Sequence, residues 1–161
     1  MQTSYSINQA AGLPGQIADS SIVQDIVTGI NSTAKAYFGR VVTKGASTDE
    51  IVHPSVNTGV TNEKVVRGIV VASHEIESKN DGDAPHYSIG SVCPVMRKGR
   101  IWVESEAAVS EGTSDVYVRV AGNLGKFTTT SDTTNTAVLP KSKWKSSTSG
   151  ANQLAVVEID L

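Results

Sequence analysis

The side chains that could do chemistry in this chain are one cysteine and three histidines. Cys93 is the only thiol, and the imidazoles are His53, His74 and His86. A thiolate activated by a neighbouring imidazole is the arrangement of a cysteine hydrolase. However, Cys93 carries no signature of such an enzyme and precedes Pro94 in a stretch typical of a strand. We therefore expect Cys93 to be a small apolar side chain, and we predict no enzyme activity and no catalytic residue.

A second catalytic pattern is present in the residue spacing but not in the expected secondary structure. Ser142 and Lys145 have the S-x-x-K spacing of serine-lysine enzymes, which requires both residues on one helical turn. This stretch has the pattern of a strand, in which residues three apart point to opposite faces. The pattern therefore does not predict a catalytic pair.

Metal and phosphate ligands are also sparse. No two histidines have i, i+4 or H-x-H spacing, and no glycine-rich phosphate loop occurs. A single cysteine excludes a structural zinc site of the usual kind. Residues 80–83 offer oxygens to calcium, but they lack the later glutamate of an EF-hand loop, so an Asx-type turn is expected. The sequence predicts no metal and no cofactor.

Length and composition bound the class of protein. The 161 residues fit one domain, residues 1–161, and a net charge of −2 argues against a nucleic-acid binder. No run approaches the roughly 18 apolar residues of a membrane span. The N-terminus has no signal-peptide pattern, so we expect synthesis in a cytoplasm, which the chain leaves only as part of an assembly.

Strand and turn patterns dominate after residue 35, because valine, serine and threonine are abundant and leucine is scarce. Strands are predicted at 36–43, 65–77, 91–96, 100–104, 115–121, 126–130, 143–147 and 154–159. Residues 97–99 are interpreted as a hairpin turn and 29–34 as a loop, while 20–28 fit either a helical face or a strand. This spacing predicts an all-β fold, either a compact β-barrel or a jelly-roll-like sandwich. The near-continuous apolar run at 65–71 indicates burial on both faces.

The first 21 residues form a different kind of segment, an extended N-terminal arm. Its apolar residues follow neither the helical nor the strand period, yet charge is absent before Asp19, unlike in disordered tails. We expect the arm to cover an open end of its own barrel or to lie on a partner, and in a symmetric oligomer both can hold. The predicted anchors are Tyr5, Ile7, Leu13, Pro14 and Ile17.

Two basic clusters are candidate contact sites. Arg97, Lys98 and Arg100 surround the predicted hairpin tip, where solvation is the default although loop tips also carry binding residues. Arg97 and Lys98 are included among the predicted partner-binding residues.

The second basic cluster lies near the C-terminus. Lys141, Lys143 and Lys145 alternate with Trp144 on the opposite face of a predicted strand. The stripe fits an acidic partner, with Trp144 as an interface anchor. The favoured interpretation is an edge strand guarded by lysine, with Trp144 in the core.

Short motifs along most of the chain resemble one known family. They are 12–19 (Gly-Leu-Pro-Gly-Gln-Ile-Ala-Asp), 25–27 (Asp-Ile-Val), 38–42 (Phe-Gly-Arg-Val-Val), 68–73 (Gly-Ile-Val-Val-Ala-Ser), 95–103 (Val-Met-Arg-Lys-Gly-Arg-Ile-Trp-Val) and 154–159 (Leu-Ala-Val-Val-Glu-Ile). In this order and spacing the chain resembles the structural cement, or decoration, proteins of tailed bacteriophage capsids. Residues 47–61 and 128–136 have no counterpart in the resemblance.

The resemblance implies a virion protein, made in the bacterial host cytoplasm, without catalytic residues. It would bind the outer surface of an icosahedral shell as a dimer or trimer. There it would bridge major capsid protein subunits against internal DNA pressure. The resemblance assigns a contact role to the predicted arm anchors, and this role is a hypothesis.

The alternative function is a carbohydrate-binding β module of a phage surface or tail protein. Trp102, Trp144 and the tyrosines would then form a stacking platform for sugar rings. This alternative requires these aromatic rings to be exposed.

Overall fold

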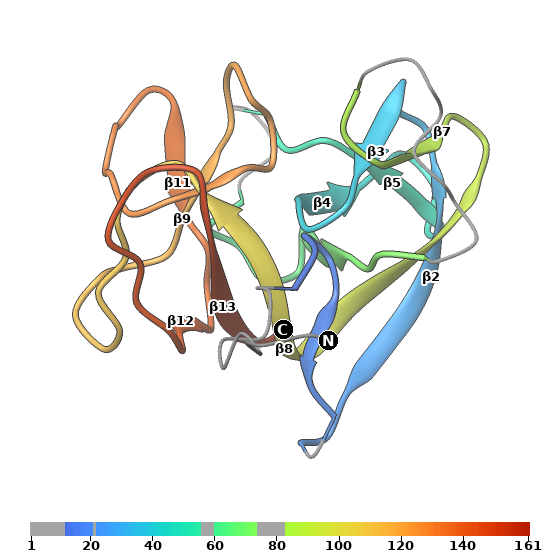
Figure 1. Cartoon of the computed structure of the whole chain (residues 1–161). Helices are drawn as coiled ribbons and strands as arrows, with labels where there is room; N and C mark the ends of the chain where they lie inside the picture. Colours follow the sequence, from blue (N-terminus) through green and yellow to red (C-terminus); the bar gives the residue numbers. More distant parts are fainter. Residues whose placement is uncertain (1–11, 21, 56–59, 74–82) are drawn as a thin grey trace.

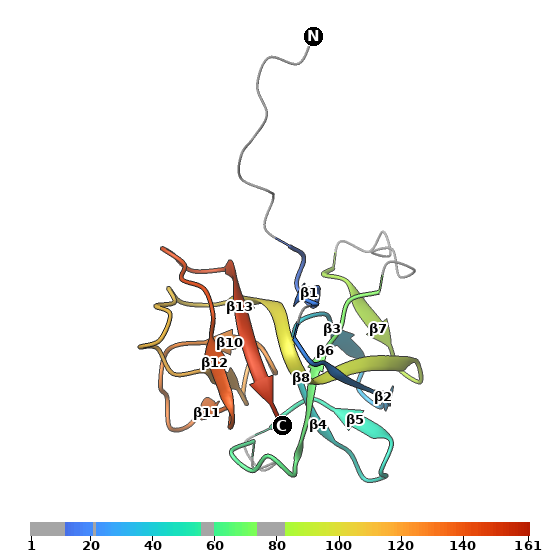
Figure 2. The ribbon, with the colours of Figure 1, turned by 90° about the horizontal axis from the view of Figure 1, so that it is seen from below.

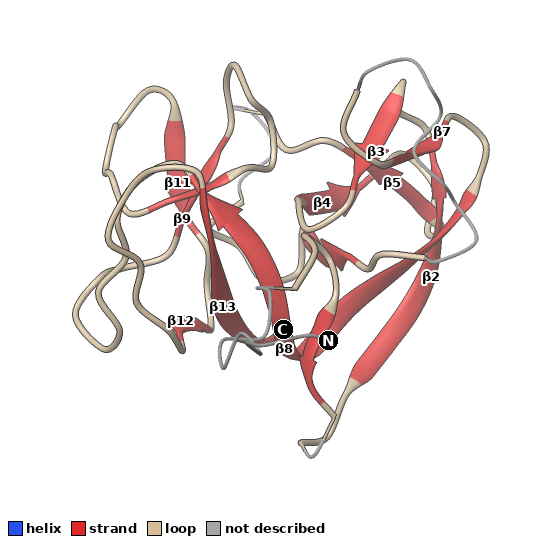
Figure 3. Ribbon diagram, viewed as in Figure 1, coloured by secondary structure: helices blue, strands red, loops and turns tan. Residues whose placement is uncertain are grey.

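The computed structural model describes residues 12–20, 22–55, 60–73 and 83–161 (Figure 1). Within these ranges the chain forms strands and loops, without a helix (Figure 3). The strands are β1 Ile17–Asp19, β2 Asp25–Asn31, β3 Lys35–Tyr37, β4 Val41–Lys44, β5 Glu50–Val52, β6 Val66–Val70, β7 His86–Ser88, β8 Val92–Ser105, β9 Tyr117–Arg119, β10 Phe127–Thr128, β11 Thr136–Val138, β12 Ser142–Trp144 and β13 Gln153–Asp160. The predicted all-β class is confirmed.

Five strands close into a barrel. β2 pairs with β8 and, in parallel, with β5; β4 lies between β5 and β6, and β6 returns to β8. The ring β8–β2–β5–β4–β6–β8 is therefore complete, and we call it the N-terminal barrel. β3 and β7 pair as a separate two-stranded sheet. The predicted barrel is confirmed, with additional strands outside the ring.

The second part of β8 carries the remaining strands, which we call the C-terminal sheet. β13 runs antiparallel along β8 from Ser105 to Lys98, and β12 pairs with β13. β10 meets β8 at Ser105, followed by β9 and β11. Figure 2 shows β8 between the C-terminal sheet on one side and the barrel on the other. One long strand thus joins the two halves of the molecule.

The hairpin turn predicted at residues 97–99 is wrong, because β8 runs through it without interruption. Lys98 pairs with both Asp25 and Asp160, and Gly99 pairs with Ile159. A two-residue type I′ turn needs two residues with positive φ, and Gly99 alone of these three has one, at 133°. Partner strands from the two ends of the chain keep this stretch extended.

Other predicted strand and loop boundaries also differ from those in the structure. The predicted strand 36–43 is split into β3 and β4 at Gly39, whose φ is 70°. The predicted loop 29–34 is partly strand, because β2 continues to Asn31, whose buried amide donates to the Tyr87 carbonyl oxygen at 3.0 Å. The predicted strand 65–77 is regular over β6 only, and its part from residue 74 lies outside the described residues.

Adjacent residues of three strands enter two different cores. Val42, Val70 and Val95 point into the barrel with Ala36, Ile51, Tyr87 and Cys93, which together form the barrel core. Their neighbours Val41, Ile69 and Met96 join a larger central core with Phe127, Trp144 and side chains of β9 and β13. The predicted burial of 65–71 on both faces is therefore confirmed for β6.

Candidate binding groove at the base of the N-terminal arm

The base of the arm is held on the protein's own body. Gly15 donates its N–H to the Trp102 carbonyl oxygen at 2.7 Å, and its own carbonyl accepts the N–H of Ala72 at 2.8 Å. Trp102 in turn donates to Gln16, and β1 pairs with β8. Residues 12–20 therefore pack in cis, while Tyr5 and Ile7 lie outside the described residues.

Two glycines let the base of the arm approach the barrel closely. Gly15 has φ 81° and Gly39 has φ 70°, and a Cβ built on either would lie within 2.8 Å of the other's backbone nitrogen. No L-residue with a side chain fits this contact without displacement. Pro14 and Gly15 form a turn in which Gln16 donates its N–H to the Leu13 carbonyl at 3.0 Å. This turn leaves Leu13 64% exposed.

Beside this contact lies a groove of about 700 Å³. The residues that line it come from the arm base, the end of β3 and the loop after it, the segment after β6, the residues before β7, β8 and the residue before β10. They are Leu13, Pro14, Gln16, Ile17, Tyr37, Phe38, Gly39, Arg40, Val71, Ala72, Ser73, Ala84, Pro85, Glu104 and Lys126. Three of the predicted contact residues, Leu13, Pro14 and Ile17, thus line one concave surface. Volumes of this size are typical of ligand-binding clefts.

One end of the groove is polar. The guanidinium carbon of Arg40 lies 4.2 Å from the ring centroid of Tyr37, a cation–π contact. Its Nη1 also donates to the Leu124 carbonyl oxygen at 3.4 Å. Burial lowers the pKa of Arg40, yet an arginine stays charged at neutral pH. Burial, and then the hydrogen bond to Asp83, raises the pKa of Tyr37.

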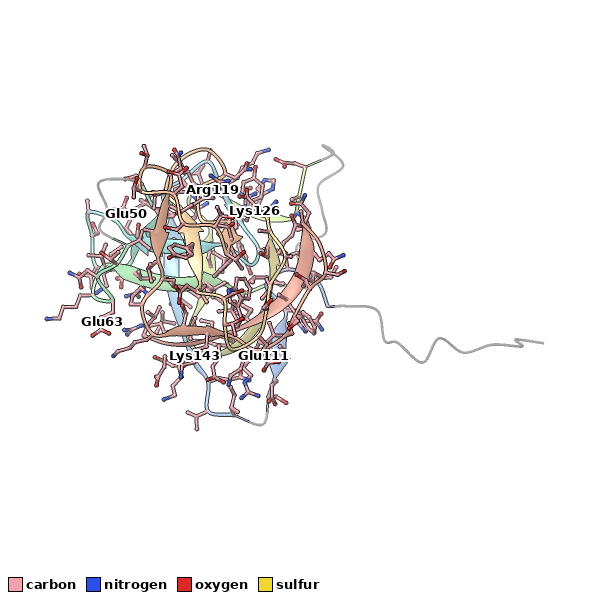
Figure 4. The ribbon with its side chains drawn as sticks, turned by 90° about the vertical axis from the view of Figure 1, so that its left-hand side faces the viewer. Glu50, Glu63, Glu111, Arg119, Lys126 and Lys143 are labelled. Carbon is pink, nitrogen blue, oxygen red and sulfur yellow. The ribbon has the colours of Figure 1, made fainter. Side chains whose placement is uncertain are left out.

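The carboxylates around Arg40 are bound to other cations. Lys35 forms an ion pair with Asp83, and its hydrogen bond holds the pKa of that carboxyl below its ordinary value. Lys126 Nζ lies 2.6 Å from Glu104. Arg119 Nε lies 2.6 Å from Glu106, and Figure 4 labels Arg119 and Lys126 near one another. Burial raises the pKa of Glu106, but the bonds from Arg119 and Asn123 outweigh it and leave the pKa lowered.

Arg97 and Lys98 lie apart from this groove, in the middle of β8. Lys98 Nζ forms an ion pair with Asp160 at 3.0 Å, and the Arg97 carbonyl accepts the N–H of Leu161. Arg100 binds both Asp19 at 3.1 Å and Glu158 at 2.7 Å. The predicted basic tip is therefore a strand segment in which Lys98 and Arg100 have acidic partners.

In the described ranges, the residues considered for cysteine catalysis have backbone carbonyls as their hydrogen-bond partners. The Cys93 side chain is fully buried, and burial raises its pKa to about 12, which keeps the thiol protonated and out of contact with solvent. His53 Nε2 lies 2.7 Å from the Lys35 carbonyl oxygen, and His86 Nδ1 lies 2.8 Å from that of Ala84. His74 lies outside the described residues.

The residues considered for metal binding are engaged in other contacts or not described. Across the described ranges no three histidine, cysteine or acidic side chains form a group that could hold a metal ion. Asp83 of the suggested calcium loop binds Lys35 and Tyr37, and residues 80–82 are not described. No helix in the described ranges has the length and apolar character to cross a membrane.

The aromatic platform of the alternative function loses Trp144 and Tyr87, which are buried, whereas Trp102, Tyr37 and Tyr117 are half-buried. Trp144 is 2% exposed; its Nε1 donates to the Asp115 carbonyl at 3.1 Å and its ring packs edge-on against Phe127. Tyr87 is also buried. The favoured interpretation of the lysine stretch is confirmed for Trp144. Among the described strands β12 pairs with β13 alone, which makes it an edge strand there. Lys143 projects from it, as labelled in Figure 4.

A second exposed surface is apolar, and the sequence patterns did not predict it. Val23, Ile26, Ile30, Ile89 and Val92 are between 41% and 76% exposed. They lie on β2, its preceding loop, the turn between β7 and β8, and the start of β8. We call them the β2 stripe. Ile26 and Ile30 share the outward face of β2, and Ile30 lies opposite Val92. The i, i+2, i+4 alternation from residue 26 was the available signal, but residues 29–34 had been interpreted as a loop.

Comparisons with known proteins relate the chain to one family. The sequence matches, over residues 1–160, the family described as Structural cement protein (E217 gp24/Pam3 gp6). No curated protein matches the sequence. A solved chain from "The capsid of Myoviridae Phage XM1" has a TM-score of 0.71 and 15% sequence identity, over 99% of this chain and 97% of that chain. At this identity the likeness concerns the fold.

Proposed function

Since the chain belongs to the structural cement protein family, we propose that it is a non-enzymatic virion protein of a bacteriophage. It binds the outer surface of the icosahedral capsid and holds neighbouring major capsid protein subunits together. It is synthesised in the bacterial host cytoplasm and acts as a dimer or trimer. Its task is to strengthen the shell, so it needs contact surfaces and no catalytic centre.

The observation that carries this proposal is the presence of two separate apolar surfaces on one molecule. The groove at the arm base and the β2 stripe share no residue. A protein that bridges subunits needs at least two contacts, and linked contacts raise the effective concentration of each other. Exposed apolar surface of this kind typically marks protein-protein contact. We assign the arm and groove to the shell.

We assign the β2 stripe to a second copy of the chain. Its outward side chains on β2 are Ile26, Thr28 and Ile30, and none is charged. Two identical uncharged surfaces meet without charge repulsion. The double variant Ile26→Ser/Ile30→Ser is expected to reduce the mass of the free protein in sedimentation equilibrium from oligomer to monomer. An unchanged oligomer would contradict this assignment.

The shell contact is tested by co-sedimentation with capsids that lack this protein, followed by heating to rupture. Saturable binding and a higher rupture temperature are expected. Deleting residues 2–11 should weaken binding while leaving thermal unfolding unchanged, because residues 12–19 and their hydrogen bonds to Trp102 and Ala72 remain. A Lys64→Gln variant, which alters an exposed side chain away from both surfaces, is the matched control.

The outcomes separate the parts of the proposal. If the full chain does not bind any matched capsid, the capsid function is wrong. If the full chain and the 2–11 deletion bind equally, the body alone makes the contact and the role of Tyr5 and Ile7 is wrong.

A further inference from the structure

Arg40 is a basic side chain of the groove that has no acidic partner among the described residues. The three carboxylates that surround it are Asp83, Glu104 and Glu106, and each is paired with another basic side chain. Arg40 itself makes no ion pair in the described part of the chain. Its contacts are the Tyr37 ring and one long hydrogen bond to Leu124. Most of its five N–H donors are therefore free to bind a guest.

The rest of the groove is suited to an apolar chain. Leu13, Pro14 and Ile17 form one wall, and Val71, Ala72 and Pro85 line other parts. A phosphate or polyanion is normally held by several donors or cations at once, and among the described residues this groove has one cation without an acidic partner. A guest with one carboxylate and apolar flanks matches both the charge and the lining.

We propose that the groove takes an extended, apolar segment of the capsid shell that carries one carboxylate, and that this carboxylate forms a bidentate ion pair with Arg40. The inference rests on the proposed function and names the chemistry of the partner segment. The planar guanidinium, whose carbon lies 4.2 Å from the Tyr37 ring centroid, has the fork geometry that a carboxylate accepts.

Residues 1–11 and 158–161 do not offer a free acidic side chain. Residues 1–11 contain no aspartate or glutamate. At the other end, Glu158 is bound to Arg100, Asp160 to Lys98, and the N–H of Leu161 to Arg97. We therefore assign the carboxylate to the shell and treat the acidic residues of segment 74–82 as the rival that the test must exclude.

The test measures affinity for capsids by co-sedimentation, at low and at high salt. Arg40→Gln is expected to weaken binding at least tenfold at low salt and to flatten its salt dependence. Arg40→Lys keeps the charge but loses the fork, so an intermediate loss is expected. Lys64→Gln removes an exposed positive charge elsewhere and should bind like the unaltered chain.

Further variants keep the test independent of folding. Ala84 is exposed at the rim, so Ala84→Trp should fill the groove and weaken binding without changing thermal unfolding. A variant with Glu75→Gln, Glu77→Gln and Asp81→Asn removes the acidic groups of the chain's own segment 74–82 and should retain full affinity. If this triple variant loses affinity as Arg40→Gln does, Arg40 serves its own chain and the inference is overturned.

The remaining outcomes are also decisive. If the unaltered chain binds capsids and Arg40→Gln binds equally well, the groove inference is wrong while the capsid function stands. If Arg40→Gln changes the oligomeric mass of the free protein, the groove holds a second copy and the inference is again overturned. If the unaltered chain binds no capsid, both proposals fail.

Discussion

The barrel core and the central core are built from different kinds of side chain. The barrel core contains two ionisable groups, the Cys93 thiol and the Tyr87 hydroxyl, which donates to the Val71 carbonyl at 3.0 Å. The central core is larger, and its described members are aliphatic or aromatic side chains and methionine, without an ionisable group. Only the barrel core should therefore respond to alkaline pH.

The cores also differ in what they connect. The barrel core lies between the ring of strands and the β3–β7 sheet. The central core joins Val41 and Ile69 of the barrel to Trp144 and Val157 of the C-terminal sheet. The groove lies over this junction, since Phe38 and Arg40 come from the barrel side and Glu104 and Lys126 from the other. The central core thus fixes the geometry on which the proposed contact surface depends.

The largest expected effect comes from the central core. Trp144→Ala removes a buried indole and should lower the free energy of unfolding by about 3–5 kcal/mol, against about 2–5 kcal/mol for Ile51→Ala in the barrel core. Denaturant titration gives both values. Hydrogen exchange should show Trp144→Ala loosening strands in both halves, whereas Ile51→Ala should loosen chiefly β2, β4 and β5. Loss of protection confined to β9–β13 in Trp144→Ala would show that the halves unfold separately.

A smaller effect tests how closely the strands of the barrel approach β8. Gly68 has φ 142°, and a Cβ there would lie 2.2 Å from the Met96 carbonyl oxygen. Gly112 has φ 76° with open space around it. Both Ala variants incur the backbone strain of a positive φ, about 1–2 kcal/mol, but Gly68→Ala also displaces β6 from β8 and should cost about 3 kcal/mol in unfolding free energy. Equal losses would mean that the close approach is relieved at no cost.

The predictable parts of the fold were those with local patterns. Val116, Val118 and Val120 alternate in the sequence, and all three are buried around β9. The apolar run that ends the chain forms β13 as predicted. The sequence Arg97-Lys98-Gly99 misled because its extended form depends on β2 and β13, which lie far away along the chain.

Only part of the groove could be predicted from the sequence, because the rest depends on residues far apart along the chain. Leu13, Pro14 and Ile17 were identified because an uncharged, irregular segment with apolar anchors needs a surface. Arg40 was not identified, because its proposed role depends on two features of the tertiary structure. The Gly15–Gly39 contact brings the arm base to the barrel, and nearby carboxylates are already paired. Neither fact has a signature in local sequence.

The smallest expected effect is a pH dependence of the free energy of unfolding that arises from the barrel core. Burial raises the pKa of Cys93 from 9.0 to about 12, so the folded state keeps the thiol neutral while the unfolded state ionises above pH 9. Stability is therefore full below pH 9 and falls as the pH rises towards 12, by on the order of 1 kcal/mol at pH 10. Tyr87 adds to this only above pH 10, its ordinary pKa, because burial and then Cys93 raise its folded pKa to about 12. Between pH 9 and 10 the unfolding free energy of Cys93→Ala should thus fall less steeply than that of the unaltered chain. Parallel curves for the two proteins would mean that the thiol ionises alike in both states, and that the barrel core is open to solvent where the central core is closed.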